Sequence, residues 1–391
     1  MRLLTQIRVV TQLSLLTLPR RKGSSLVIVA CMACVVGVLL SVLSVTVGLL
    51  HTYEVAGSRE RAIVFSRDAL SFGGRTEETS TIAPDAIGTL VGAPGIGRDA
   101  DGKPMIDAEV LAMLPPAEGF ANGSLYVRGV DASGLAMRPE FKLISGRLFR
   151  PGIHEMIVGI GVDRGFGLKV GDRIIMPDGE WPIVGEFSTG GGINESELLS
   201  DVATVMSAMR TTNVSSVLVG LESPGAFDAF KSWLTSNPAL ALTAERQSDY
   251  YRQVAWTSSA FFTAVAYLSG GVMALGALFG AVKILHTAVD LRTREIATLS
   301  AIGYDPLPIA VSVVLEGVIL SLLGALAGAL VARILVDGRL ETVWSAVFTL
   351  SVSPGLIALG AGWALVLAVL GGIVPAIRSA RLPVAEALRQ A

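Results

Sequence analysis

The chain has 391 residues, of which 51% are hydrophobic, and its mean hydropathy of +0.61 exceeds that of an ordinary soluble domain. Its formal net charge of -2 offers no basic surface for nucleic acid. The two cysteines, Cys31 and Cys34, both lie in an apolar run, so the sequence predicts neither a disulfide framework nor a thiolate metal site. We interpret this pair as small apolar side chains.

The first segment, residues 1–24, predicts a short amphipathic helix on the cytoplasmic membrane surface. Leu3, Ile7 and Val10 recur at helical spacing, with polar residues between them. Pro19 argues against a continuous helix into the apolar run that follows.

Four apolar runs are each longer than the roughly 20 residues needed to cross a bilayer. They are predicted to span the membrane at residues 25–50, 258–285, 306–336 and 354–377. Lysine and arginine gather in residues 1–24, in the loop 286–305 and in the tail 378–391. Because cytoplasmic loops carry the excess of these residues, we expect both termini to be cytoplasmic in a bacterial inner membrane, with residues 51–257 and a short loop at 337–353 in the periplasm.

The large segment 51–257 has the pattern of a mixed α/β domain. Strand-like runs occur at residues 62–65, 124–129, 155–159, 173–176 and 181–187, and a strand–helix–strand pattern covers residues 214–221, 224–237 and 240–244. The predicted fold is therefore a membrane protein of four transmembrane α-helices with a large mixed α/β extracytoplasmic domain inserted between helices 1 and 2.

The loop 286–305 predicts a short amphipathic helix on the cytoplasmic side. Its apolar positions include Ile296, Leu299 and Ile302, and Gly303 ends the periodic stretch. Arg292, Arg294 and Glu295 add the charges. Such a helix can dock into a groove on a cytosolic partner, or it can simply lie on lipid headgroups.

Two features inside the spans suggest packing or function. Glu316 is the one carboxylate within a predicted span, and we weigh a packing or dimer role against a gating or proton role. Small residues recur four apart at Gly276 and Gly280, and again at Gly324 and Gly328. This spacing lets helix backbones approach closely in a helix bundle or a dimer.

A nucleotide site within the chain is not predicted. Gly97 to Lys103 resembles a phosphate-binding loop, but Pro104 stands where the motif needs a hydroxyl, and no apolar strand precedes the segment. The three histidines lie far apart in sequence, and no nucleophile and base can be placed together. We therefore expect a non-catalytic chain without a cofactor of its own, which takes its energy from another polypeptide.

Several segments carry a resemblance to a known family. These are Arg292 to Gly303 (RTREIATLSAIG), Leu315 to Gly328, Pro375 to Arg389, Gly146 to Phe149 and Gly167 to Asp172. They look like the FtsX-like, MacB-type permeases, the type VII ABC transporters. The resemblance is strong over residues 285–391 and looser over residues 52–250.

This resemblance implies a homodimer or heterodimer of permeases bound to a dimer of cytosolic ABC ATPases, which would bind ATP and Mg²⁺. The family's contact with the ATPase would fall on the charged and apolar residues of the loop 286–305. The resemblance also implies an outer domain of two parts, at about 52–120 plus 205–255 and at about 121–204. Membrane lipid, a periplasmic adaptor and an outer-membrane channel are further candidate partners.

Three functions follow as alternatives. The first is a permease that moves a lipid, lipoprotein or hydrophobic peptide or small molecule on the outer side by mechanical transmission. The second is a non-transport regulator that activates an extracytoplasmic cell-wall hydrolase. The size of the outer segment favours the first, and a membrane-anchored hydrolase lacks any catalytic constellation.

Overall fold

The protein, seen in a computed structural model, is described at residues 2–17, 22–71, 74–114, 124–291, 305–343 and 345–380. It has two compact units. The helical unit comprises residues 1–47, 261–337 and 351–391, and the sheet unit comprises residues 48–260 and 338–350.

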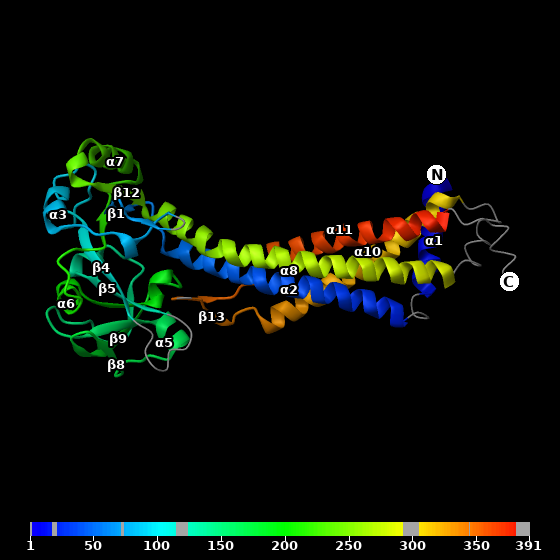
Figure 1. Ribbon diagram of the computed structural model, residues 1–391, viewed down its shortest axis with the longest axis horizontal. Coiled ribbons are helices and arrows are strands. Elements are labelled where there is room, and N and C mark those ends of the chain that lie inside the picture. Colours follow the sequence, from blue (N-terminus) through cyan, green and yellow to red (C-terminus); the bar gives the residue numbers. More distant parts are fainter. Residues whose placement is uncertain are drawn as a thin grey trace. The chain divides into compact units, whose positions relative to one another are not determined.

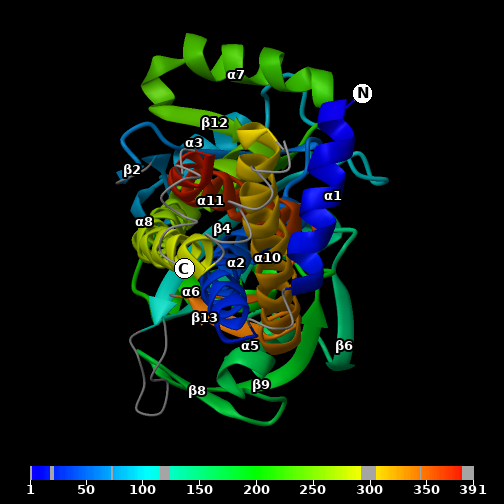
Figure 2. The same ribbon diagram turned by 90° about the vertical axis from the view of Figure 1, so that its right-hand side faces the viewer.

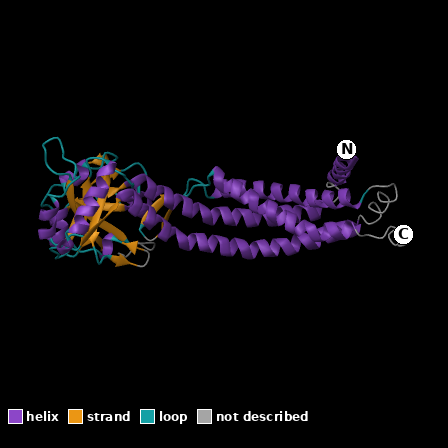
Figure 3. Ribbon diagram, turned by 90° about the horizontal axis from the view of Figure 1, so that it is seen from above, coloured by secondary structure: helices purple, strands orange, loops and turns teal. Residues whose placement is uncertain are grey.

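Among the described residues, five helices contribute to the helical unit: α1 (Arg2–Thr17), α2 (Lys22–Ala56), α8 (Gln247–Leu291), α10 (Pro306–Leu335) and α11 (Pro354–Ala380). Four of them are long and apolar enough to cross a membrane, at Ser25–Ala56, Gln247–Ile284, Leu307–Leu335 and Pro354–Ile377. Helices α2 and α8 extend beyond the spans predicted at 25–50 and 258–285, because helical hydrogen bonding continues where the composition turns polar. Figure 3 shows the helices and strands by colour.

The N-terminal segment forms helix α1, which packs against α10 (Figure 2). Val10, one of the periodic apolar residues, is buried. Helix α1 ends at Thr17 and α2 begins at Lys22, and Pro19, where the sequence predicts a break, lies outside the described residues.

Small residues bring α2 and α10 into close backbone contact. A Cβ added at Gly324 would lie 2.6 Å from the carbonyl oxygen of Val29, and one at Gly328 would collide with the carbonyl oxygen of Ala33. Around this crossing, Val36, Leu39 and Leu40 of α2 are buried. In contrast, a Cβ at Gly276 or Gly280 would meet no atom within 4 Å among the described residues. The two glycine pairs therefore differ, although their spacing is the same.

The sheet unit is built on one ten-stranded sheet, in the order β12-β1-β11-β4-β5-β10-β7-β9-β6, with β8 paired to β9 (Figure 1). Its strands are β1 (Arg61–Ser66), β4 (Ile106–Leu114), β5 (Leu125–Val130), β6 (Lys142–Gly146), β7 (Met156–Gly159), β8 (Arg173–Met176), β9 (Gly179–Ser188), β10 (Glu197–Asp201), β11 (Ser216–Gly220) and β12 (Leu242–Arg246). The helices in this unit are α3 (Pro84–Leu90), α4 (Ala132–Ala136), α5 (Ile160–Phe166), α6 (Val202–Ala208) and α7 (Phe227–Ser236). Minor elements are the pair β2 (Leu70–Ser71) and β3 (Gly74–Arg75) and the 3-10 turns at Glu77–Thr79, Ile193–Ser196, Pro224–Ala226 and Pro238–Leu240.

Strand β4 joins the two halves of the sheet. Its residues 106–109 pair with β11, and its residues 110–114 pair with β5. Strands from about 52–120 and 205–255 lie on one side of this junction, and those from 125–201 lie on the other. One core connects them, with Val64, Val127 and Trp181 among its buried residues.

The loop between α10 and α11 is more than the short connector predicted at 337–353. It forms the hairpin β13 (Leu340–Val343) and β14 (Ala346–Thr349), which belongs to the sheet unit. The backbone N–H of Val347 donates to Ser196 Oγ at 2.9 Å, and Val347 side-chain atoms fill the space beside Gly165. The hairpin buries three consecutive residues, Ala346, Val347 and Phe348, so its apolar side chains pack within the protein.

Candidate functional site

The residues predicted to contact an ATPase lie outside the described part of the chain. They are Arg292, Arg294, Glu295, Ile296, Leu299, Ile302 and Gly303. Glu316 lies in α10 and is 7% exposed, buried within the helical unit. Cys31 and Cys34 are unpaired in α2, and both are exposed.

The segment that resembles a phosphate-binding loop forms a closed surface turn. Arg98 bridges to Pro104, and the Asp99 carboxylate accepts the backbone N–H groups of Asp101 and Lys103. A phosphate would need such N–H groups free. The Asp99 carboxylate thus occupies two of the backbone N–H groups of this turn.

The sheet unit contains a buried charge cluster centred on Arg128 of β5. Its guanidinium is 3% exposed and uses all five of its N–H donors on carboxylates. Glu77 and Glu197 each take two of these bonds and Glu109 takes one, at 2.6–2.9 Å. Burial acts to lower the pKa of Arg128, but Glu197 and Glu77 outweigh it and hold that pKa well above its usual range. The cation therefore stays charged and fixes three chain segments at one point.

Arg138, which follows helix α4, extends the cluster. Its Nη2 donates to Glu109 Oε1 at 2.5 Å, and its Nη1 donates to the carbonyl oxygen of Gly134. Burial acts to raise the pKa of Glu109, but Arg138 and Arg128 outweigh it and lower that pKa. Glu109 is therefore an ionised carboxylate held between two guanidinium groups.

Asp107 lies two residues before Glu109 on β4. It is fully buried, and its carboxylate has fewer charged partners than that of Glu109. Its Oδ1 accepts the backbone N–H of Asp131, while its Oδ2 has no hydrogen-bond partner in the described chain and lies 3.6 Å from Arg138 Nη1. Burial and the charge of Glu109 raise the pKa of Asp107 well above its usual range, against the effect of Arg138. The folded protein therefore holds a proton on Asp107 that the unfolded chain releases at lower pH.

This difference predicts how stability depends on pH. The contribution of Asp107 to the unfolding free energy is complete below its unfolded pKa and is lost as pH rises through its folded pKa, by up to about 1.4 kcal/mol per pH unit within that window. Asp107→Asn cannot titrate, so its unfolding temperature should fall less between pH 4 and pH 8 than that of the unaltered chain. Parallel melting profiles of the two proteins across this range would contradict the assignment.

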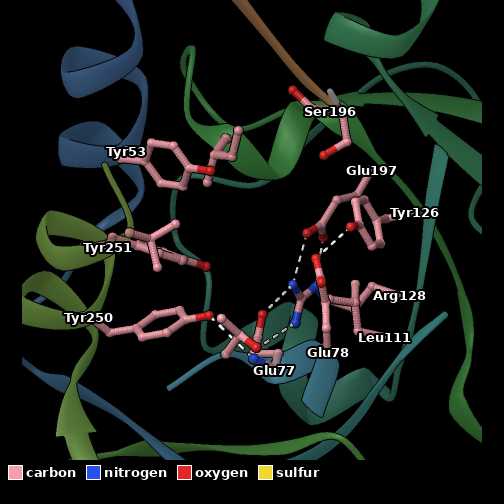
Figure 4. A pocket seen from close by; sticks show the side chains of 14 residues that line it. Tyr53, Glu77, Glu78, Leu111, Tyr126, Arg128, Ser196, Glu197, Tyr250 and Tyr251 are labelled. Atoms are coloured by element: carbon pink, nitrogen blue, oxygen red, sulfur yellow. Dashed lines mark hydrogen bonds and ion pairs between the residues drawn. The ribbon is translucent and has the colours of Figure 1, made fainter. Parts of the chain in front are cut away.

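A cavity of about 120 Å³ opens beside the Arg128 cluster. Figure 4 shows Tyr53, Tyr250 and Tyr251 on one side of it, with Glu77, Arg128 and Glu197 opposite. Tyr53 comes from the last turns of α2, and the other two tyrosines come from the first turns of α8. All of these residues belong to the sheet unit. Helix ends and sheet thus meet at one charged, aromatic site.

Sequence reasoning did not find this cluster. Its members come from β4, β5, β10 and the 3-10 turn Glu77–Thr79, and no short motif joins them. One signal was present: Arg128 falls in a strand-like run, where its charge is unusual. Strand β4 was not predicted, because Asp107 and Glu109 interrupt its apolar run with two acids.

The comparisons with known proteins give a family over part of the chain. Residues 267–384 match the FtsX-like permease C-terminal family. A comparison with curated protein sequences found no match. One similar solved structure is the extracellular domain of the noncanonic ABC-type transporter YknZ from Gram-positive bacteria, at 14% identity and a TM-score of 0.34, covering 47% of this chain and 99% of that one.

Proposed function

We propose that the chain is the permease subunit of an ABC transporter, from the premise that its residues 267–384 match the FtsX-like permease C-terminal family. The family match is the observation that carries the proposal. Four helices suited to crossing a membrane support it. In this proposal a separate cytosolic ATPase dimer binds ATP and Mg²⁺, and the permease does no chemistry.

The proposed point of contact with the ATPase is the segment 286–305, which begins in the last turns of α8 and ends at the start of α10. Its charged and apolar residues would dock as a short helix into a groove of the ATPase. Both termini would then be cytoplasmic and the sheet unit periplasmic, in a bacterial inner membrane. A second permease copy or a related chain would complete the assembly.

The proposed output is a change in the sheet unit driven through α2 and α8. Residues 48–56 of α2 and 247–260 of α8 are built into the core of that unit. Tyr250 lies 5.0 Å from Phe65 of β1, measured between ring centroids, and Tyr251 lies 6.0 Å from Tyr53. A displacement of either helix would reach strand β1 through these rings, which pack too closely to deform freely.

The proposed substrate is a lipid, a lipoprotein, or a hydrophobic peptide or small molecule handled on the outer side of the membrane. The most apolar 18-residue windows of the candidate spans have mean hydropathies of 1.8–3.0 and hold at most two charged residues each. A hydrophilic path for a polar solute would need charged or polar lining residues. The helices therefore favour a substrate that moves on the outer side of the membrane over a polar solute that passes between them.

The test is to purify the chain with its ATPase and to measure ATP hydrolysis and substrate release in vesicles. Leu299→Asp should leave membrane insertion intact but lower coupled activity at least tenfold, because a charge replaces an apolar docking contact. Leu340→Asp makes the same chemical change at an exposed position of β13 and should have no such effect.

Two results would refute the proposal. One is the absence of any co-purifying ATPase, and the other is unaltered coupling in Leu299→Asp. A cell-wall hydrolase as the only outer partner would replace transport with regulation.

A further inference from the structure

The cavity beside Arg128 has a charge and a shape that identify a class of ligand. Fourteen residues line it, and the charged ones are Glu77, Glu78, Glu197 and Arg128. Three carboxylates against one guanidinium leave a formal charge of -2 at the cavity wall. Glu109 lies behind this wall and is shared between Arg128 and Arg138. An anion would be repelled, whereas a cation would be attracted.

The guanidinium cannot neutralise the cavity further. All five N–H groups of Arg128 are already directed at carboxylate oxygens, and both carboxylate oxygens of Glu77 and of Glu197 are used in those bonds. Glu78 is different, because it is exposed and its Oε1 accepts one bond, from the hydroxyl of Tyr126 at 2.5 Å. The carboxylate of Glu78 therefore has more acceptor capacity left for a ligand than Glu77 or Glu197, each of whose oxygens already accepts from Arg128.

The opposite wall is aromatic. Tyr250 and Tyr251 are each 6% exposed, and their ring centroids lie 5.4 Å apart. The oxygen of Tyr250 accepts the backbone N–H of Glu77 at 3.4 Å, and a phenol oxygen has a second lone pair that can accept from a ligand. Figure 4 shows this hydroxyl pointing toward the carboxylates across the cavity. This buried phenol can therefore accept one further hydrogen bond from a donor in the cavity.

These observations lead us to propose that the cavity binds a primary ammonium group on a short alkyl chain. The ammonium would donate to Glu78 and to the phenol oxygens, and the alkyl chain would lie against the tyrosine rings. A cavity of about 120 Å³ is slightly smaller than one that accepts benzene, so a chain of four carbons is the expected length. A free alkylamine and a lysine side chain of a peptide share this chemistry.

Two other cations fit less well. A bare divalent metal needs several free oxygen ligands, and Arg128 occupies those of Glu77 and Glu197. A quaternary ammonium binds aromatic faces but has no N–H for Glu78 or for the phenol oxygens. The primary amine is the cation that uses both walls. This inference does not depend on the proposed transport function.

The test is calorimetric titration of the full chain in detergent micelles with n-butylamine hydrochloride, which is protonated at pH 7.5. We expect saturable binding, with n-butanol and sodium butyrate giving none. Tetramethylammonium chloride should bind at least tenfold more weakly. Titration with a lysine-containing tripeptide, in parallel, distinguishes a peptide side chain from a free amine by which of the two binds more tightly.

Two variants locate the site. Glu78→Gln keeps the acceptor for Tyr126 but removes the charge, and it should weaken butylamine binding about tenfold, the cost of one charge-assisted hydrogen bond. Tyr250→Phe keeps the ring and removes the hydroxyl, and it should also weaken binding. Glu180→Gln alters an exposed carboxylate far along β9, which serves as the matched control and should change nothing.

Absence of butylamine binding to the unaltered chain would overturn the proposal. Equal binding to Glu78→Gln would do the same, since the ligand would then lie elsewhere. Tetramethylammonium bound as tightly as butylamine would overturn the assignment to a primary amine. Circular dichroism of each variant distinguishes a lost site from a lost fold.

Discussion

Arg128→Ala is expected to lower the unfolding free energy of the protein by about 3–5 kcal/mol, the usual cost of removing one partner from a buried ion pair. The substitution leaves Glu77, Glu109 and Glu197 close together in a buried place without the cation that compensates them. Burial makes an isolated carboxylate costly, and three neighbouring ones also repel each other. Thermal unfolding of the full chain in detergent measures the effect.

A matched control comes from an exposed pair in the same sheet. Arg173 and Glu180 lie 2.8 Å apart, but their side chains are 68% and 59% exposed. Arg173→Ala should therefore change stability by less than about 0.5 kcal/mol. Arg128→Lys should fall between the two, because an ammonium offers three donors where the guanidinium offers five. Similar melting temperatures for Arg128→Ala and Arg173→Ala would show that the buried cluster does not hold the sheet unit together.

Gly328→Leu is expected to destabilise the helical unit by about 1–3 kcal/mol or more, the range for overpacking a tight contact. Its Cβ would collide with the carbonyl oxygen and Cα of Ala33, which are backbone atoms of α2 and cannot rotate away. The same approach brings Gly37 to 3.5 Å from the Gly328 oxygen, measured from an added Cβ. Helices α2 and α10 would have to separate, which opens the core around Leu39 and Leu40.

Gly280→Leu provides the comparison for this prediction. It has the same four-residue glycine spacing and the same change in side-chain volume, yet its Cβ meets no described atom within 4 Å. We expect the melting temperature of the monomeric chain in detergent to be unchanged by Gly280→Leu and clearly lowered by Gly328→Leu. Equal effects of both substitutions would contradict the packing. A loss of dimer, without loss of stability, in Gly280→Leu alone would place this glycine at a contact between two chains.

Local composition determined the membrane helices. Crossing a bilayer requires a continuous apolar run, and that requirement is visible at residues 25–50, 258–285, 306–336 and 354–377 without knowledge of any partner. Helices suited to spanning occur at those places. Most strands of the sheet unit were predicted for a similar reason, since alternating or continuous apolar runs bounded by turn residues mark them. Strand β6, by contrast, is exposed along its whole length and carries no such pattern.

Pairings between distant residues were decided by the tertiary structure. Asp107 and Glu109 look like surface acids in the sequence, but register in the sheet brings Arg128 opposite Leu111 and places the guanidinium beside Glu109. The hairpin of β13 and β14 becomes part of the sheet unit because it contacts α5 and forms a hydrogen bond with Ser196.

The four glycines show most plainly that spacing in the sequence does not reveal which residues pack closely. Gly324 and Gly328 cannot be told from Gly276 and Gly280 by spacing, and only the approach of α2 separates them. The physical reason is that hydropathy and periodicity are properties of neighbours along the chain. Burial of a charge or of a glycine Cα depends instead on which distant segment packs against it, and local sequence patterns contain no information about that contact.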